Sequence, residues 1–244
     1  MAESDDRKTR QEQMVAEMAE LAGGLAHELR NPLSTMMINL KLLAEDLSDS
    51  DARLVDVRRR ALIKVDRLSR EAKRLQSLFD EFLRLAGPCR LNLVSVDVNR
   101  VVRELVEFVK PMATNAGIPI EFEHDPGSLD CWIDVNLIRQ ALLNLLINAQ
   151  QAMPDGGTLT IKTIGTPDHI SIQVKDTGVG ISAKDQERIM RPFVSTKPDG
   201  NGLGLSITRR VVQEHGGELT LQSKLGQGTT ATLSIPRKPY SANS

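Results

Sequence analysis

The sequence predicts an α+β protein in two parts: a long helical hairpin, then an α/β sandwich. Apolar residues recur at spacings of three and four from about residue 11 to residue 86, which predicts helices. From residue 91 onward, short alternating apolar stretches predict strands interleaved with helices. Twelve of the 17 glycines fall between residues 156 and 228. We therefore predict a helical domain over 1–88, an α/β domain over 89–238 and a tail over 239–244.

The composition of the chain argues against several classes of protein. The 31 basic and 32 acidic side chains leave a net charge of −1, and aromatic residues make up 3% of the chain. Neither a polyanion-binding surface nor a base-stacking surface is expected, so no nucleic-acid partner is predicted. No run of roughly 18 apolar residues predicts a membrane segment. Two cysteines without a CxxC spacing favour a reducing, cytoplasmic setting, and no histidine spacing predicts a zinc site.

The helical part consists of two amphipathic stretches joined by the turn "DLSDSDA" and ended by Gly87-Pro88. Helices of this length would each extend roughly 50 Å. A lone hairpin leaves each apolar stripe half covered, which favours a homodimer with a four-helix bundle. A single hairpin packed on the second half is the alternative. The expected stripe residues are Val15, Met18, Ala22, Leu25, Leu29, Met36, Leu40, Leu43, Leu54, Val57, Ala61, Leu68, Ala72, Leu75, Phe79, Phe82 and Ala86.

The second part reads as a mixed, largely antiparallel sheet with helices on one face. Helices are expected over 99–116, 135–153 and 205–217. Strands are expected over 91–98, 118–124, 131–134, 158–164, 169–176, 218–224 and 229–236.

His27 is predicted to point into solvent. Each residue of a helix turns by about 100°, so His27 lies roughly 180–200° from Met18 and Leu25 of the stripe. Asn31 and Ser34 fall within about 40° of it, on the same exposed face. Taken alone, an exposed histidine is most simply an ordinary surface residue.

The residues near His27 suggest that its ring acts as a nucleophile. Glu28 can accept a proton from one ring nitrogen, which leaves the other nitrogen nucleophilic. Asn31 can hold a water or a phosphoryl oxygen one turn further on. Pro32 cannot donate to the carbonyl of Glu28, so a bend is expected after the histidine, and glycines 23–24 loosen the preceding turn. The segment is interpreted as a nucleophile at a bend.

Two further motifs suggest a nucleotide site. Asn144 and Asn148 lie four apart on one helix face and offer neutral oxygens to Mg²⁺. Asp176 ends a strand, and as an acceptor it favours an exocyclic amino group such as that of adenine. Gly178 and Gly180 would let the backbone pass close to a flat ligand. A buried structural asparagine and a plain Asx turn are the structural alternatives.

The stretch "GNGLGLS" (200–206) places Gly202, Leu203 and Gly204 just before a helix, where backbone N–H groups bind phosphate. Its spacing is neither GxGxxG after a first strand nor a Walker loop.

The 21 residues between Gly180 and Gly202 are long enough for a lid. Within them Phe193 is a candidate anchor, and Lys197 is a candidate cation for the terminal phosphates.

Taken in order, these motifs resemble the H, N, G1, F and G2 boxes of two-component sensor histidine kinases, most closely the nitrogen-regulation-type branch. The resemblance covers about residues 15 to 236. The stretches that carry it are "HELRNPLS", "NLLINAQQAM", "DTGVGI", "RPFVSTK", "GNGLGLSI" and "GQGTTATLSIP".

The resemblance implies a dimerisation and phosphotransfer bundle followed by a Bergerat-type ATP-binding domain. His27 corresponds to the phospho-accepting histidine and Glu28 to its acidic helper. Asn31 corresponds to the residue that aids dephosphorylation of the partner, a response-regulator receiver domain.

In the second domain the resemblance implies ATP and Mg²⁺ as cofactors. Asn148 corresponds to the metal ligand, with Asn144 beside it, and Asp176 to the adenine-binding aspartate. Thr229 corresponds to a threonine near the adenine. The loop residues that correspond are Gly178, Gly180, Gly202, Leu203 and Gly204.

Some positions depart from the commonest pattern. Gln151 and Ala152 stand where many relatives carry a basic residue and then an aromatic one, and Arg191 stands where Glu is frequent. Phosphate contact must then come from elsewhere, with Lys197 the candidate. Two other functions remain open: a module that acts mainly as a regulator phosphatase, and a Bergerat-type ATPase that is no kinase. The chain is expected to be cytoplasmic, or the cytosolic part of a longer sensor.

Overall fold

The computed structural model describes residues 2–48, 54–87, 90–195, 197 and 200–238. The chain divides into two compact units, Met1–Gly87 and Pro88–Ser244. Most of the expected turn at 46–52, the Pro88 that follows the second helix and the tail at 239–244 lie outside the described residues. No helix of the described part is long and apolar enough to cross a membrane.

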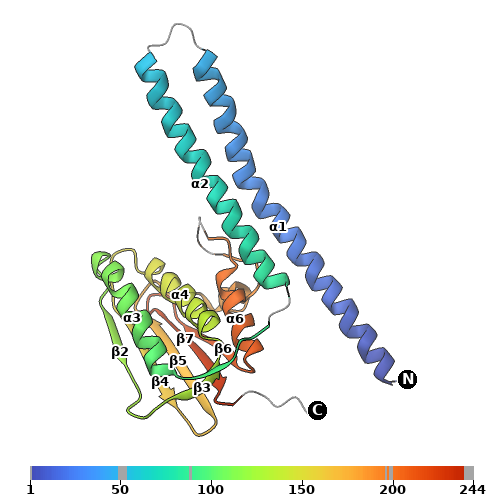
Figure 1. Cartoon of the computed structure of the whole chain (residues 1–244), viewed down its shortest axis with the longest axis vertical. Helices are drawn as coiled ribbons and strands as arrows, with labels where there is room; N and C mark the ends of the chain where they lie inside the picture. The colour runs from blue at the N-terminus through green and yellow to red at the C-terminus, as the bar shows by residue number, and fades with distance from the viewer. Residues whose placement is uncertain (1, 49–53, 88–89, 196, 198–199, 239–244) are drawn as a thin grey trace. The chain divides into compact units, whose positions relative to one another are not determined.

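The first unit is a hairpin of two long helices, α1 (Ala2–Ser48) and α2 (Leu54–Ala86), drawn side by side in Figure 1. α1 continues as one helix through Gly23, Gly24 and Pro32, as the helical pattern of the sequence predicts, and the bend expected after His27 stays a prediction. Pro32 lies inside the helix and is buried. The turn that follows is also supported by side chains, because Ser34 Oγ donates to the carbonyl of Arg30 at 2.8 Å.

The apolar contact stripe follows the predicted one at most described positions, which are half-buried: Leu25, Leu29, Met36, Leu43, Val57, Ala61, Leu68, Leu75, Phe82 and Ala86. It departs from the prediction at others. Leu40 and Phe79 are about half exposed, whereas Asn39 and Leu78, one residue earlier in each helix, are buried. Asn39 remains satisfied because its Nδ2 donates to the carbonyl of Thr35 at 2.8 Å. Large apolar side chains therefore remain exposed on both helices: Met18, Leu33, Met37, Ile38, Leu40, Leu42, Leu47, Leu54, Val55, Leu62, Ile63, Val65, Phe79 and Leu83.

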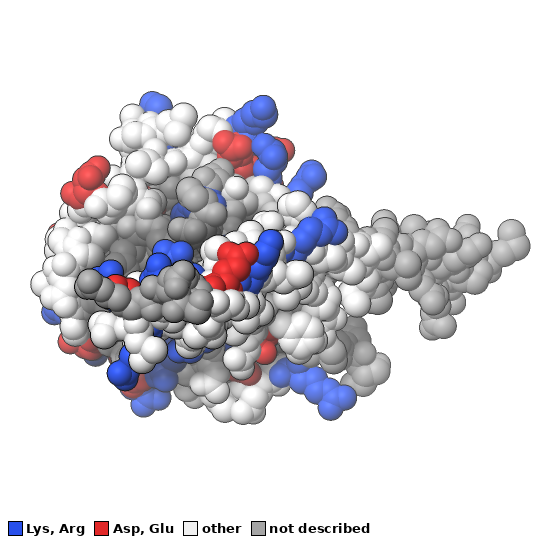
Figure 2. Space-filling model, turned by 90° about the horizontal axis from the view of Figure 1, so that it is seen from above, with Lys and Arg blue, Asp and Glu red and all other residues white. Residues whose placement is uncertain are grey.

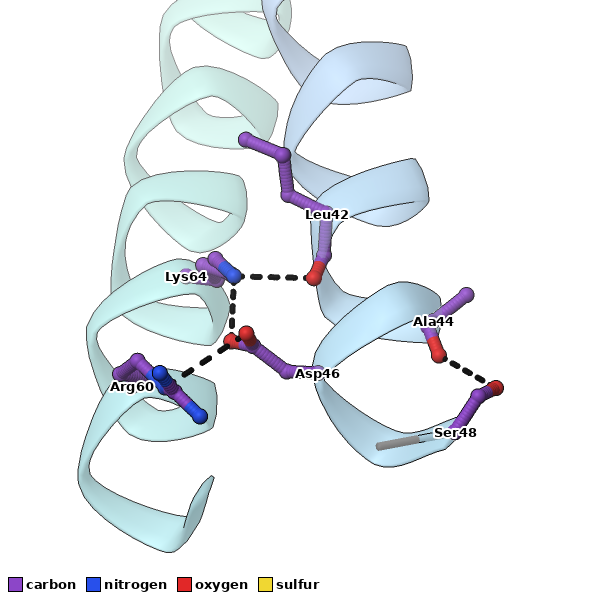
Figure 3. A network of polar contacts seen from close by, with 6 residues as sticks. All are labelled: Leu42, Ala44, Asp46, Ser48, Arg60 and Lys64. Carbon is purple, nitrogen blue, oxygen red and sulfur yellow. Dashed lines mark hydrogen bonds and ion pairs between the residues drawn. The ribbon is translucent and has the colours of Figure 1, made fainter. Parts of the chain in front are cut away.

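A polar cluster ties the end of α1 to α2 (Figure 3). Lys64 donates to Asp46 and, at 2.9 Å, to the carbonyl of Leu42, and Arg60 approaches Asp46 at 3.5 Å. The last turn of α1 has no basic residue of its own. Lys64 and Arg60 therefore supply the positive charge that a helix C-terminus favours, and they compensate Asp46. The Lys64 contact also lowers the pKa of the Asp46 carboxyl.

The second unit is the predicted α/β sandwich. Its main sheet has the order β2-β4-β5-β7-β6, antiparallel except for the parallel pair β2–β4, and β1 and β3 form a separate antiparallel pair. The strands are β1 (Val94–Asp97), β2 (Ile120–Glu123), β3 (Asp130–Ile133), β4 (Leu159–Gly165), β5 (His169–Asp176), β6 (Glu218–Ser223) and β7 (Thr229–Pro236). The helices are α3 (Val98–Asn115), α4 (Val135–Gln151), α5 (Ala183–Gln186) and α6 (Gly204–Glu214), with a 3₁₀ turn at Arg188–Met190.

One face of the main sheet forms the core. Ile170, Ile172 and Val174 of β5 are buried at alternate positions, as the period of a strand requires. The helices α3, α4 and α6 supply the buried side chains opposite, among them Ile138 and Val212, both almost without exposure. These helices cover the sheet in Figure 1.

Two aspartates fix where the helices start. The Asp97 side chain caps α3 through Asn99 N, and the Asp134 side chain caps α4 through the amides of Asn136 and Leu137. The buried His215 ring strengthens the second cap, because its Nε2 accepts from Asp134 N at 2.9 Å.

Charge is spread rather than segregated. On the face drawn in Figure 2, basic and acidic side chains are interspersed among uncharged ones. This distribution matches the net charge of −1.

Candidate functional site

The His27 side chain lies on the exposed surface of α1. Asn31 and Ser34 are exposed as well, as the helical spacing predicts, and Glu28 is half-buried. Among the described residues the His27 ring makes no hydrogen bond. The imidazole is therefore accessible to a reacting group, with a carboxylate next to it in the chain.

The second candidate site is assembled around α4 and the start of α6. Asn144 and Asn148 are half-buried on one face of α4. Asn144 Nδ2 lies 3.4 Å from the carbonyl of Gly204, the first residue of α6. A Cβ built on Gly204 would lie 3.9 Å from the side-chain amide nitrogens of both asparagines. The structure therefore brings the two asparagines and the start of α6 together.

Asp176 lies buried at the end of β5. Its Oδ1 accepts hydrogen bonds from Gly178 N at 2.8 Å and Thr229 N at 3.2 Å. Burial raises the pKa of this carboxyl, although both backbone donors and the charge of Lys197 oppose the rise. Within the described part of the chain Oδ2 has no hydrogen-bond partner. One oxygen is thus structural, and the other can accept from a ligand.

Two of the loop glycines lie against other segments of the protein backbone. A Cβ on Gly178 would lie 2.4 Å from the Ala152 carbonyl oxygen. On Gly180, at φ +67°, it would lie 2.1 Å from the Lys224 carbonyl oxygen. Both glycines are therefore required by the protein backbone that lies where a side chain would be, and their contact with a ligand stays a prediction.

The other glycines of the predicted site differ from one another. Gly202 has a φ of +68°, and a Cβ there would lie 2.5 Å from Val194 N, so it too accommodates protein backbone. Gly204 is the one whose missing side chain leaves room beside the two asparagines. Leu203, between them, is fully buried and anchors the start of α6 in the core. Phe193 is half-buried and has a φ of +59°, which is unusual for a residue with a side chain.

Ser223 was missed by sequence reasoning. Its hydroxyl accepts from Ile181 N at 2.8 Å, donates to the carbonyl of Gly228 at 2.9 Å and contacts Thr229 Oγ1 at 2.8 Å. It therefore joins the segment after Asp176 to the β6–β7 turn. The only available signal was its position at the end of a strand, which is too common to single it out.

Lys197 reaches α4. Its Nζ donates to Asn148 Oδ1 at 2.9 Å and to Gln151 Oε1 at 2.7 Å, and it lies 3.4 Å from the Asn148 carbonyl oxygen. Burial lowers the pKa of this ammonium, while the nearby charge of Asp176 opposes the shift. Gln151, an uncharged residue, was not expected to contact phosphate itself. In the structure it binds Lys197, which is the candidate for that contact.

Comparison with known proteins defines the class. Residues 17–87 match the His Kinase A (phospho-acceptor) domain, and residues 133–239 match the "Histidine kinase-, DNA gyrase B-, and HSP90-like ATPase" family. The chain therefore has the two domains, in order, of the catalytic core of a protein-histidine kinase.

Individual relatives agree with this class. The sensor histidine kinase ZraS of Klebsiella oxytoca is 34% identical over 229 residues, which cover 93% of this chain and 47% of ZraS. Sporulation kinase C of Bacillus subtilis is 33% identical over 242 residues, covering 98% of this chain and 53% of the kinase. The chain spans about half the length of these relatives.

A solved structure shows the same fold. The histidine kinase ThkA, in complex with the response regulator TrrA, aligns with a TM-score of 0.76. The alignment covers 99% of this chain and 68% of that chain at 24% identity.

Proposed function

We propose that this chain transfers the γ-phosphoryl group of ATP to His27 and then to an aspartate of a response-regulator receiver domain. One observation carries the proposal: an exposed His27–Asn31 face and a site around Asn148 and Asp176 occur in the same chain, in domains of the matching families. Residues 1–88 act as the dimerisation and phosphotransfer domain, and residues 89–238 bind ATP.

The geometry supports an adenine nucleotide. Asp176 Oδ2 is an acceptor at the end of β5 and suits the amino group of adenine, with Thr229 beside it. The first turn of α6 has no side-chain cap, so its backbone N–H groups suit phosphate. The half-buried Asn148 offers a hard neutral oxygen, which fits Mg²⁺, and the ion would neutralise phosphate charge.

At the acceptor, the His27 ring nitrogen forms the N–P bond as the bond to the bridging oxygen of ADP breaks. Glu28 accepts the proton of the other ring nitrogen, which keeps the attacking nitrogen basic. The phosphoryl group then passes to the carboxylate of the receiver domain, and the imidazole is regenerated. Asn31, exposed one turn further on, positions a water that hydrolyses the phosphorylated regulator.

The working assembly is a homodimer, supported by the exposed apolar side chains of α1 and α2. ThkA was solved with a response regulator, which supports a partner of that class here. We assign the chain to the nitrogen-regulation-type branch on the run "NAQQAM", and to the cytoplasm, where ATP and receiver domains are found.

Labelled ATP tests the proposal. Wild-type protein with Mg²⁺ is expected to gain label that is lost in acid and kept in alkali, as for phosphohistidine. His27→Gln should gain none while binding ATP with unchanged affinity. Acid-stable label, or label retained by His27→Gln, would refute the assignment. Steady ATP hydrolysis without phosphorylated His27 would instead favour a Bergerat-type ATPase that is no kinase.

Two asparagine variants separate autophosphorylation from dephosphorylation of the receiver domain. Asn148→Ala should lose autophosphorylation and keep dephosphorylation of a phosphorylated receiver domain, since Asn31 is intact. Asn31→Ala should keep autophosphorylation and lose dephosphorylation of the receiver domain. Loss of both activities in both variants would contradict the separate roles.

A further inference from the structure

The Lys197 ammonium occupies oxygens that a divalent cation would use. Asn148 Oδ1, at 2.9 Å from Nζ, is the oxygen assigned above to Mg²⁺. Gln151 Oε1, three residues further along α4, accepts from the same ammonium at 2.7 Å. Both acceptors are neutral amide oxygens, the kind that hard cations share with ammonium groups.

The backbone N–H and carbonyl of Lys197 are hydrogen-bonded to Ser195 and Gly200. Ser195 Oγ accepts from Lys197 N at 3.0 Å and donates to the Lys197 carbonyl at 3.2 Å. Gly200 N donates to the same carbonyl at 3.3 Å, and a Cβ on Gly200 would lie 2.3 Å from Ser195 Oγ. A side chain at Gly200 would therefore displace the Ser195 hydroxyl, which bonds the Lys197 backbone.

No carboxylate of the described residues forms an ion pair with Lys197. Asp176 acts on it only through space, and the direct partners are uncharged. A half-buried cation without a direct counter-charge is costly, and an incoming anion relieves that cost. Among the described residues, the ammonium thus lies beside the proposed phosphate site without a directly bonded carboxylate.

We propose that Lys197 and a divalent cation are alternative occupants of Asn148 Oδ1. When the metal is absent, Lys197 supplies the positive charge that holds the nucleotide phosphates. When the metal is present, Asn148 releases the ammonium. This inference rests on the proposed function, and it predicts that Lys197 matters most for nucleotide bound without metal.

The test is the dissociation constant of ATP, measured by calorimetry once in EDTA and once in saturating Mg²⁺. Lys197→Met removes the charge and keeps the length of the side chain. It should weaken metal-free binding on the order of tenfold, the effect of one charge-assisted hydrogen bond. Binding with Mg²⁺ should weaken clearly less. The ratio of the dissociation constant in EDTA to that in Mg²⁺ should therefore be higher for Lys197→Met than for wild type.

Two further variants make the test specific. Lys175→Met changes an exposed lysine of β5 next to Asp176 in the chain and should leave the ratio unchanged. The double variant Gln151→Lys with Lys197→Gln moves the ammonium onto α4 and should restore metal-free binding.

The outcomes are distinguishable. Equal weakening with and without Mg²⁺, or no weakening in EDTA, would overturn the alternative occupancy while leaving the kinase assignment intact. Failure of the wild-type protein to bind ATP under either condition would overturn the proposed function and the inference with it. The fluorescence spectrum of Trp132 checks that each variant is folded.

Discussion

At the scale of single residues, the two oxygens of Asp176 separate structure from binding. Oδ1 accepts two backbone N–H groups, and Oδ2 accepts none within the described part of the chain. An asparagine could present its oxygen to the same two donors but would place an amide group where a ligand donor is expected. Asp176→Asn should therefore fold, and it should lose most of its affinity for adenine nucleotides.

The pKa of Asp176 adds a pH dependence. Because burial raises it in the folded state, the folded chain binds more protons than the unfolded chain between the ordinary value of 3.8 and the raised value. The contribution of Asp176 to stability thus falls as pH rises through that window. Asp176→Asn lacks this titration, so its stability relative to wild type should increase from pH 4 to pH 7.

Denaturant unfolding followed by Trp132 fluorescence measures this difference, since Trp132 is the only tryptophan and lies in the second unit. A difference that stays constant with pH would contradict the role of burial.

The residue scale also shows how far sequence reasoning reaches. The exposure of His27 and Asn31 followed from helical angles alone, and the pairing of Asn144 with Asn148 followed from their spacing. The Lys197–Gln151 contact did not, because a contact 46 residues apart in sequence depends on how a long loop folds back. The buried ring of His215 was missed for the same reason: its partner is Asp134 N, 81 residues away.

At the scale of elements, the hydrophobic period and the turn residues predicted the strands and the three long helices of the second unit to within a few residues, but not the short α5. The continuous helix through Gly23, Gly24 and Pro32 agrees with the helical pattern of the sequence, and the bend after His27 stays a prediction. The close approaches of backbone to Gly178 and Gly180 could not be predicted, since the sequence does not reveal which segment lies against a glycine.

A matched pair of glycines tests how much the close approach at Gly180 matters for stability. Gly180→Ala adds a Cβ 2.1 Å from the Lys224 carbonyl oxygen, whereas Gly226→Ala, at a similar positive φ, adds one to open space. Gly226→Ala should cost about 1 kcal/mol of unfolding free energy from backbone strain alone. Gly180→Ala should cost about 3 kcal/mol, because the clash is added to the strain. Equal losses, read from Trp132 fluorescence in denaturant, would show that the close approach is unimportant.

At the scale of the whole molecule, the two units bury their apolar surface differently. The second unit has a continuous core from β4, β5 and β7 to the helices, whereas the hairpin leaves many large apolar side chains exposed. A second copy covering them would make the stability of the hairpin depend on protein concentration.

Melting at several concentrations tests this difference. The helical signal at 222 nm contains the transition of the hairpin, and its midpoint should rise with concentration over a hundredfold range. The Trp132 transition, which reports on the second unit, should stay fixed. A helical transition independent of concentration would instead support a single hairpin covered by the rest of its own chain.

The unbroken course of α1 has a mechanical consequence. Residues 2–26 precede His27 in one helix, and the glycine pair lies within it. A rod of this kind transmits torque, whereas a hinged one would dissipate it. A rotation of the first turns of α1 is therefore expected to change the orientation of the His27 imidazole.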